Sequence, residues 1–354
     1  MKIKFAIIGG GVAGLCAAIR LAELGEKALI IEGGTYPTQK VCGEFLSPEC
    51  IAILHAWGIH PVAIPQVDVI SSNYSLSFPF PSPAGGLSHM ELDPALMHLA
   101  LKLGVKIKTK TRVESFKPKL VTDALHLIHL NNGEVIQAEQ VLIATGRIPG
   151  YAIKVPEMRY MGFKAHFRNL KKMDNLKMYT LPQAYLGIAP IENHLHNVAC
   201  LADLKTVKKY KNPQEFIEKL ILSDATLKEN LTKENNLFES WMIVETPNFG
   251  IKHTPNWLDT YFIGDAALTV PPACGNGLAL AIIGGKLAAE FATKKHYLAF
   301  KKNWKKRCAS PLFWSKGLHH ILMNAAFNQP LLRVANFFPS ICKNVYKMTR
   351  QLIK

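Results

Sequence analysis

Glycines with the spacing that dinucleotide binding requires lie near the N-terminus. The pattern comprises Gly9, Gly11 and Gly14. The first allows a tight turn, the second lets the backbone approach a pyrophosphate, and the third lets a helix pack against the neighbouring strand. Apolar residues predict that strand over residues 4–8 and the helix over residues 12–24. We therefore expect the amides of Val12 and Ala13, at the positive end of the helix dipole, to face phosphate groups.

An acidic residue completes this motif at the end of the next predicted strand, residues 27–32. That residue is Glu32. A carboxylate at this point accepts hydrogen bonds from ribose hydroxyls and repels a 2′-phosphate. The N-terminal segment therefore favours FAD or NAD over NADP.

A second glycine-rich segment, far from the first in sequence, indicates a flavin. Gly264 and Asp265 end a predicted buried strand, and a loop rich in glycine and proline precedes an alanine-rich helix predicted over residues 277–293. The aspartate can accept a hydrogen bond from a ribityl hydroxyl, and Gly275 and Gly277 let a flat ring approach the main chain. The helix would direct its positive end at the flavin pyrimidine oxygen. The two segments together predict FAD.

Four short motifs are spread over residues 1 to 295. They are GGGVAG at residues 9–14, VCGEFLSP at residues 41–48, ATG at residues 144–146 and GDAALTVPPACGNG at residues 264–277. Together they resemble the geranylgeranyl reductase family, within the p-hydroxybenzoate-hydroxylase-like FAD-dependent oxidoreductases. The resemblance implies that the ADP half of FAD is held by Gly9, Gly11, Gly14 and Glu32. It implies that Asp265 binds the ribityl chain and the pyrophosphate. At the isoalloxazine ring it places Cys42, Gly43, Gly275 and Gly277.

The complete set of residues expected at FAD combines the motifs with this resemblance. It comprises Gly9, Gly11, Val12, Ala13, Gly14, Glu32, Cys42, Gly43, Val113, Thr145, Gly146, Gly264, Asp265, Pro272, Gly275, Asn276, Gly277 and Leu278. No metal site is expected, because the seven cysteines lack ligand-like spacing.

Departures from the wider group favour its reductase branch. An arginine common in the family before the Leu92-Asp93 pair is absent, since the local residues are Ser88, His89, Met90 and Glu91. Ubiquinone-pathway hydroxylases tend to carry a histidine where this chain has Leu268. They also carry an Asp-Gly motif linked to NAD(P)H use where this chain has Thr145-Gly146-Arg147.

No catalytic residue is evident, but three candidates stand out. Cys42 and Cys274 each precede a glycine in a loop expected to flank the flavin ring. We expect the two thiols to approach each other, and a disulfide would require Cα atoms within about 7 Å. The alternative is that both are small packing residues. Tyr185 falls in a strand that either lines a substrate cavity or belongs to a core.

The order of predicted elements indicates an α/β protein with a Rossmann-type FAD-binding domain. This discontinuous domain is predicted to comprise residues 1–75, 90–150 and 258–295. A mostly antiparallel β-sheet substrate domain is inserted at residues 76–89 and 151–257. A basic helical tail follows at residues 296–354. Within the first domain, Asp93 as N-cap and Pro94 at the first helical position predict a helix over residues 94–103.

The net charge of +16 is concentrated in the tail. Residues 294–354 contain thirteen Lys and Arg and no Asp or Glu, so the rest of the chain is nearly balanced. This distribution argues against a nucleic-acid partner. Two interpretations stand for the tail and its apolar residues, which include Phe313 and Trp314. It either contacts an anionic membrane peripherally or packs on the body of the protein with its lysines in solvent.

We therefore expect an FAD-dependent oxidoreductase that acts on a hydrophobic substrate of isoprenoid, lipid or polyketide-like type, by double-bond reduction. The alternatives are an FAD-dependent monooxygenase of an aromatic or polyketide-like substrate and an electron-transfer flavoprotein. NAD(P)H is a candidate for the transient reductant. The scattered cysteines make the cytoplasm the default compartment, with peripheral association at the inner face of the membrane as an option.

Overall fold

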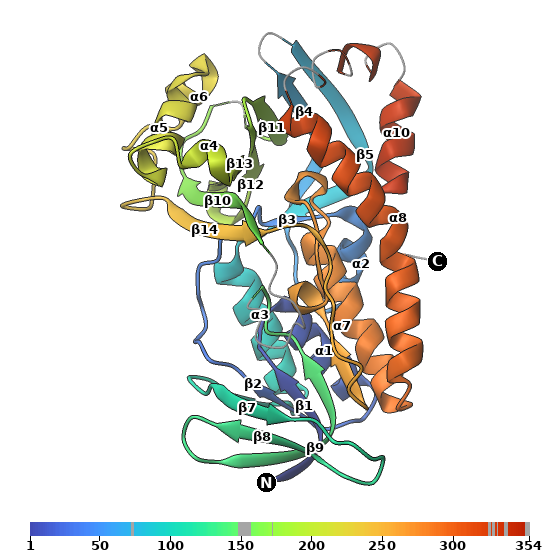
Figure 1. Ribbon diagram of the computed structural model, residues 1–354. Coiled ribbons are helices and arrows are strands. Elements are labelled where there is room, and N and C mark those ends of the chain that lie inside the picture. Colours follow the sequence, from blue (N-terminus) through green and yellow to red (C-terminus); the bar gives the residue numbers. More distant parts are fainter. Residues whose placement is uncertain are drawn as a thin grey trace.

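A largely parallel sheet forms one end of the molecule (Figure 1). Its order is β6-β2-β1-β9-β8-β7, and β16 also pairs with β9. The parallel strands are β1 (Lys2–Ile8), β2 (Ala28–Ile31), β6 (Lys106–Lys108), β9 (Val135–Ile143) and β16 (Thr260–Phe262). An antiparallel pair, β7 (Val113–Lys117) and β8 (His126–Leu130), extends the edge at β9. In this computed structural model the described residues are 1–71, 74–147, 157–171, 173–324, 327, 330, 332–335 and 339–350.

Three helices cover this sheet: α1 (Val12–Glu23), α3 (His89–Lys102) and α7 (Gly277–Thr293). The helix predicted over residues 277–293 is thereby confirmed. Close approach of α1 and α7 depends on small side chains. A Cβ atom added at Gly285 would lie 2.4 Å from the carbonyl oxygen of Ala13. The residues of α7 and the N-terminal glycine turn, far apart in sequence, are therefore packed directly together.

An eight-stranded sheet forms the other end, in the order β14-β10-β13-β12-β11-β4-β5-β3. Its strands are β3 (Phe45–Leu46), β4 (Val62–Ser71), β5 (Tyr74–Gly86), β10 (Met158–Phe167), β11 (Leu176–Leu181), β12 (Ala184–Pro190), β13 (His196–Asp203) and β14 (Met242–Pro247). All neighbours are antiparallel except β4 and β11. Packed at one end of it are α4 (Leu204–Val207), α5 (Pro213–Leu222) and α6 (Ala225–Asn230) (Figure 1).

The sheets correct two expectations from the sequence. Residues 62–71 form β4 of the second sheet, so the predicted boundary between 75 and 76 is wrong, because β4 pairs with β5 along its whole length. The helix predicted to start at Pro94 begins five residues earlier, at His89, with Ser88 as N-cap. Asp93 lies inside that helix, where its carboxylate bonds other side chains instead of capping. The predicted boundary at 150 and 151 lies outside the described residues.

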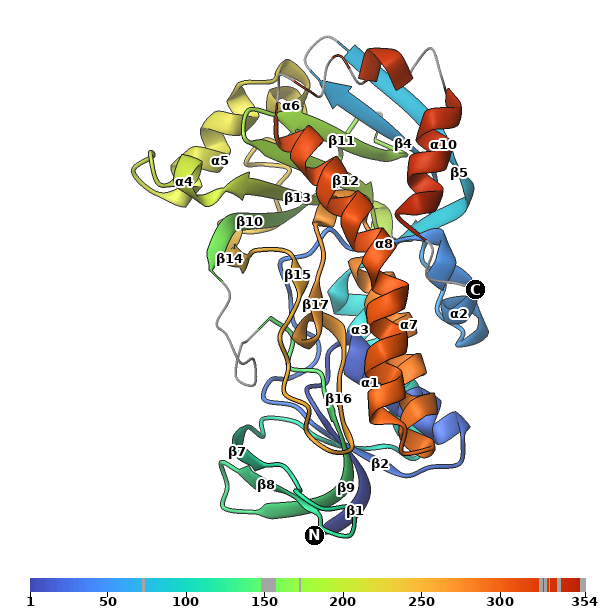
Figure 2. The same ribbon diagram turned by 45° about the vertical axis from the view of Figure 1, so that its right-hand side comes forward.

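The C-terminal helices connect the two ends of the molecule. Helix α8 (Tyr297–Met323) runs along α7 and continues to the second sheet, where it contacts β11 and β12 (Figure 2). Helix α10 (Pro339–Met348) lies beside α8, and α2 (Pro48–Ala56) contacts β5. Short elements complete the fold: η1 (Glu192–His194), β15 (Gly250–Ile251), η2 (Gly264–Ala266), β17 (Leu268–Thr269) and η3 (Pro272–Cys274). Within the described part of the chain, none of the helices combines the length and apolar character needed to cross a membrane.

The contact between α1 and α7 predicts the effect of enlarging Gly285. Gly285→Ala should lower the free energy of unfolding by about 1–3 kcal/mol, since the new methyl group meets backbone atoms that cannot move aside cheaply. Gly317→Ala in α8 is the matched control, because no described atom outside the adjoining helix backbone lies within 4 Å of the added Cβ. Helix propensity alone should therefore give a gain of about 1 kcal/mol. Thermal denaturation of both variants measures the difference, and equal midpoints would contradict the close approach.

Candidate active site

A single continuous cavity of about 1480 Å³ extends from the glycine turn after β1 to the inner face of the second sheet. Small-ligand pockets usually measure about 300–1,000 Å³, so this cavity has room for a cofactor and a second molecule. Its walls come from three sources, which are the first sheet with its loops, the second sheet, and helices α8 and α10. The cavity therefore lies where the two sheets and the tail meet.

The end of the cavity at β1 has the shape that a pyrophosphate requires. Gly9 has a φ of +104°, and a Cβ there would lie 2.4 Å from the carbonyl oxygen of Ala144. A Cβ at Gly14 would lie 2.0 Å from the carbonyl oxygen of Gly9. Among the described residues, apart from the adjoining backbone, the only atom within 4 Å of a Cβ added at Gly11 is Nζ of Lys40, at 3.8 Å, so the backbone is open there. The first amides of α1 have no partner within the helix and are available to an anion.

Charged side chains line this same end. Glu32 accepts hydrogen bonds from the amides of Gly10 and Gly34, each at 2.6 Å, which holds its carboxylate at the cavity wall. The side chain of Arg112 lies against Gly33 and also lines the cavity. This end of the cavity thus has a carboxylate suited to ribose hydroxyls. It also has two cations suited to phosphate oxygens, Lys40 and Arg112.

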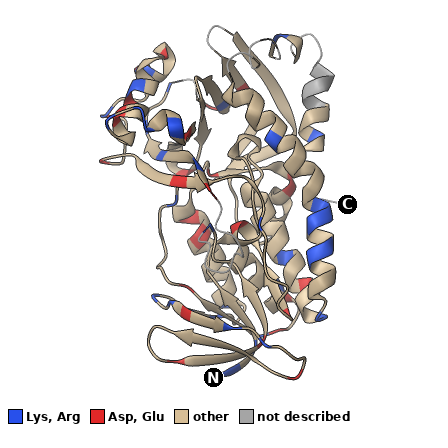
Figure 3. Cartoon of the chain, viewed as in Figure 1, with Lys and Arg blue, Asp and Glu red and all other residues tan. Residues whose placement is uncertain are grey.

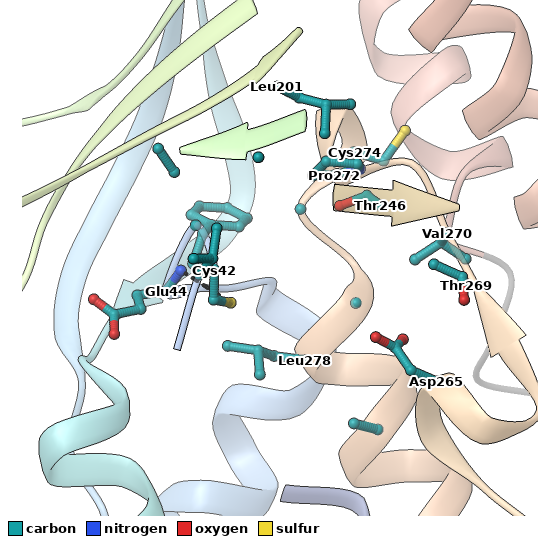
Figure 4. A pocket seen from close by; sticks show the side chains of 18 of the residues that line it. Cys42, Glu44, Leu201, Thr246, Asp265, Thr269, Val270, Pro272, Cys274 and Leu278 are labelled. Carbon is teal, nitrogen blue, oxygen red and sulfur yellow. Dashed lines mark hydrogen bonds between the residues drawn. The ribbon is translucent and has the colours of Figure 1, made fainter. Parts of the chain in front are cut away.

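The loop after β16 forms the opposite wall (Figure 4). Asp265 and Leu278 both line the cavity, and Nε of Arg147 lies 3.8 Å from Oδ2 of Asp265. Gly275 has a φ of +62°, and a Cβ at this residue would lie 2.4 Å from the ring of Phe45. Glycine at this position therefore lets the loop pass close to residues 42–45, and α7 begins at the cavity with its positive end exposed to it.

Residues 42–45 carry a network of titratable groups that reaches the cavity at Cys42. The Cys42 thiol forms a hydrogen bond with the ring of His89. Nδ1 of His89 lies 2.9 Å from Oδ1 of Asp93, and Oδ2 of Asp93 accepts from Nζ of Lys40. Burial favours the neutral imidazole, but Asp93 and Cys42 outweigh it and raise the pKa of His89 to about 9. Burial would likewise raise the pKa of Cys42, but His89 outweighs it and lowers that pKa.

The neighbouring Glu44 is fully buried and is held by the second sheet. Its Oε1 accepts from Nζ of Lys164 at 2.5 Å and from the amide of His89 at 2.8 Å. Its Oε2 lies 2.7 Å from Nε2 of His166. Burial opposes ionisation, yet His166 and Lys164 outweigh it and lower the pKa of Glu44. The carboxylate is therefore ionised, and it holds the Cys42 loop against β10.

The comparisons with known proteins agree with this arrangement. A family model described as an FAD binding domain matches residues 4–40. The chain is 22% identical over 337 residues to a menaquinone reductase of Mycolicibacterium smegmatis, which covers 84% of this chain and 78% of that protein. The flavin-dependent brominase Bmp2 superposes with a TM-score of 0.83 at 17% identity, covering 99% of this chain and 94% of that one. A geranylgeranyl bacteriochlorophyll reductase-like protein of Thermoplasma acidophilum gives 0.73 at 17% identity, covering 98% and 99%.

The chain is an FAD-dependent oxidoreductase. The resemblance found in the sequence is confirmed at the level of this superfamily, and the predicted fold class is confirmed with it. Bound FAD supplies electron-pair and hydride chemistry, so the protein's residues need to bind it, orient it and hold protons near it.

Most residues predicted at FAD line this cavity. They are Gly9, Gly11, Val12, Ala13, Glu32, Cys42, Gly43, Val113, Thr145, Gly146, Gly264, Asp265, Pro272, Gly275, Gly277 and Leu278. Gly14 and Asn276 are not on its wall. Gly14 packs against Gly9, and the buried amide of Asn276 donates to the carbonyl of Thr349 at 3.2 Å. That Gly14 and Asn276 contact FAD remains a prediction, and any such contact would have to be made through backbone next to the cavity wall.

The catalytic candidates all line the cavity, but they do not form one cluster. Cys42 and Cys274 are free thiols, so no disulfide joins them, and Figure 4 places them on different walls. The hydroxyl of Tyr185 accepts from the amide of Ala273 at 3.2 Å, and burial raises its pKa well above the ordinary value. Tyr185 therefore stays protonated and supports the loop that carries Cys274.

The sequence reasoning missed four side chains at this site: Lys40, His89, Asp93 and Arg112. The sequence shows that these residues are basic or acidic, but it does not show that they lie together. His89 lies in the segment that lacks an arginine, and the sequence predicts Asp93 as a helix cap. Their convergence on Cys42 and on the glycine turn depends on contacts between segments more than forty residues apart, as in the pair of Lys40 and Asp93.

Removing the charge of Glu32 should weaken FAD binding. In Glu32→Gln one carboxylate oxygen is replaced by an NH2 donor that faces the amide of Gly10 or Gly34. The lost hydrogen bond costs about 1.5–3 kcal/mol, which corresponds to roughly a 10–100-fold rise in Kd for FAD. Titration of apoprotein with FAD, followed by quenching of flavin fluorescence, measures this change. Glu26→Gln, which removes a surface carboxylate paired with Lys4, is the control and should bind FAD normally. Equal affinity of the two variants would exclude Glu32 from the site.

Proposed function

We propose that this oxidoreductase reduces a carbon–carbon double bond in a hydrophobic, isoprenoid-like or lipid-like substrate. The observation that carries the proposal is the apolar end of the cavity, which continues directly from the loops expected at the flavin. Its walls include Val67, Val69, Leu76, Phe78, Phe80, Leu176, Met178, Leu201, Leu318 and Ile321. Side chains of this kind recognise a substrate by burying apolar surface.

The distribution of charge along the cavity supports the same assignment. The acidic and basic side chains gather at the end formed by the first sheet and by residues 40–44, where the cofactor is expected. The end formed by β4, β5 and β11 is lined mostly by aliphatic and aromatic residues. A substrate without charge fits that end, because a buried unpaired charge would be costly there.

Names of similar proteins support a reductase as well. The matched mycobacterial relative is named a menaquinone reductase, and one structural neighbour is described as geranylgeranyl bacteriochlorophyll reductase-like. An electron carrier is disfavoured, because a carrier needs an exposed flavin edge and this cavity is covered by the second sheet and by α8 and α10. Oxygen transfer by a monooxygenase is the outcome that the test below must distinguish.

The test is a single turnover without oxygen. The FAD of the purified protein is reduced chemically, and the reduced protein is mixed with a prenylated quinone or a polyprenyl lipid. The mass of the product is then measured by mass spectrometry. The expected product has gained two hydrogen atoms. A gain of one oxygen atom, obtained only when oxygen is admitted, would make the protein a monooxygenase and overturn the proposal.

A bulky residue at Gly187 should separate substrate binding from FAD binding. Gly187 lines the cavity from β12, and a Cβ there meets nothing closer than two backbone oxygens at 4.0 Å. Gly187→Phe should therefore fill part of the apolar end without displacing the strand. We expect KM for the lipid to rise about 10-fold or more, in line with the roughly 1.5–3 kcal/mol that an apolar side chain contributes on burial, while Kd for FAD is unchanged. An unchanged KM would place the substrate elsewhere.

We also propose that α8 brings the protein to an anionic membrane surface. Phe313 is 70% exposed and Trp314 is 36% exposed, although Leu322 on the other side of the helix is buried. Lys302 and Lys305 lie exposed on the preceding turns, within the basic stretch visible in Figure 3. Each such lysine near an anionic surface contributes about 1 kcal/mol. Because Trp314 also lines the cavity, a lipid substrate would have a short path from the membrane to the site.

Vesicle flotation tests this surface. Wild-type protein should float with vesicles that contain phosphatidylglycerol and much less with vesicles of phosphatidylcholine alone. Lys302→Glu/Lys305→Glu should lose most of that binding, and Phe313→Ala part of it. Lys208→Glu/Lys209→Glu, which makes the same charge change at exposed residues after α4, is the control and should still float. Binding that ignores lipid charge and the α8 changes would contradict the proposal.

A further inference from the structure

A chain of hydrogen bonds leads from solvent to the sulfur of Cys42. It begins at Lys40, whose side chain is 39% exposed, and passes to Asp93, whose side chain is 1% exposed. From Asp93 it passes to Nδ1 of His89, and the His89 ring interacts in turn with the Cys42 side chain. His89 is itself nearly buried. Lys40, Cys42 and His89 all line the cavity, and Cys42 lies in the loop that is expected beside the flavin ring.

The electrostatics of this chain couple the titration of Cys42 to that of His89. The pKa of the thiol is lowered and that of the imidazole is raised to about 9, because each group favours the charged form of the other. The charged groups that face the pair are Asp93 within α3, Lys40 and Glu44 from the loop before and after Cys42, and, beyond Glu44, Lys164 and His166 of β10.

Other proton donors on the described cavity wall are poorly suited to this role. Glu44 is ionised by Lys164 and His166. The hydroxyl of Tyr185 is held by Ala273, and burial raises its pKa well above the ordinary value. Burial raises the pKa of the Cys274 thiol.

We propose that Cys42 is the general acid of the reduction and that His89 supplies its proton, with Asp93 and Lys40 as positioning residues. This assignment rests on the proposed double-bond reduction. One carbon of the double bond receives a hydride from reduced FAD, and the other receives the proton from the Cys42 sulfur. The π bond is replaced by two C–H bonds, FAD is left oxidised, and the sulfur regains its proton from His89. Solvent then reprotonates His89 at the Lys40 end of the chain.

The state of the thiol can be measured without turnover. The purified holoprotein is treated with iodoacetamide at a series of pH values, and alkylation of Cys42 is followed by mass spectrometry of its peptide. The rate for wild-type Cys42 should rise at a lower pH than that of an ordinary cysteine, because His89 lowers the pKa of the thiol. In His89→Gln the rate should rise only as pH approaches the ordinary cysteine value of about 8.5. His55→Gln, which changes an exposed histidine, is the control. Identical profiles in wild type and His89→Gln would overturn the pairing.

The two half-reactions separate the acid from the flavin. In Cys42→Ala, chemical reduction of FAD should proceed as in wild type, while reoxidation by the alkene should slow about 100-fold or more, the usual contribution of a positioned acid. Cys308→Ala, which removes a buried thiol outside the cavity wall, is the control. In wild type, the rate of the alkene step should fall as pH rises through about 9, where His89 loses its proton. In Asp93→Asn this fall should occur at lower pH.

Each result has one meaning. If wild type reduces the alkene and Cys42→Ala keeps its rate, the acid assignment fails while the proposed function stands. If wild type reduces no alkene, the proposed function fails and the acid assignment fails with it, whatever the alkylation profile. A slow alkene step in Cys42→Ala, together with an altered alkylation profile in His89→Gln, supports the assignment in full.

Discussion

The buried carboxylate of Glu44 is the contact on which the arrangement of this site depends. A fully buried charge is tolerated only when it is paired and hydrogen-bonded, and removing one partner typically costs about 3–5 kcal/mol. Glu44 has three partners, Lys164 and His166 from β10 and the amide of His89 at the start of α3. Its backbone also has a φ of +52°, which a non-glycine residue adopts only where its surroundings compensate. The loop before β3 is therefore held against both sheets at once.

That anchoring has a chemical consequence two residues away. Because Glu44 binds the amide of His89, the imidazole is placed one turn before Asp93 on α3 and within reach of Cys42. The glycine at position 275 lets the opposite loop approach Phe45, so the two loops expected at the flavin ring come close together. Structural ion pairs and site chemistry are thus built from the same short segment, and a change at Lys164 would be felt at the Cys42 thiol.

The C-terminal tail has two faces with different roles. Trp304 packs against Gly284 of α7, and Leu318 and Ile321 line the cavity, so this side of the tail belongs to the body of the protein. Arg350, just after α10, donates to the carbonyl of Cys274 at 2.6 Å and so ties the tail to the flavin loop. Lys302, Lys305 and Phe313 are exposed on the outer face. A basic charge count alone could not separate these faces, because their division depends on which side of α8 meets α7 and the second sheet.

The sequence by itself determined the features that depend on neighbouring residues. The glycine turn at residues 9–14, the helix at 277–293 and the prediction of FAD follow from local spacing, because backbone freedom and helix dipoles act over a few residues. Only the tertiary structure decided that β4 joins the second sheet, since strand pairing depends on partners such as β11 more than a hundred residues away. It also decided that the Asp93 carboxylate bonds His89 and Lys40 instead of capping a helix. The acidity of Cys42 arises the same way, because a pKa depends on charges brought together in space and not on their order along the chain.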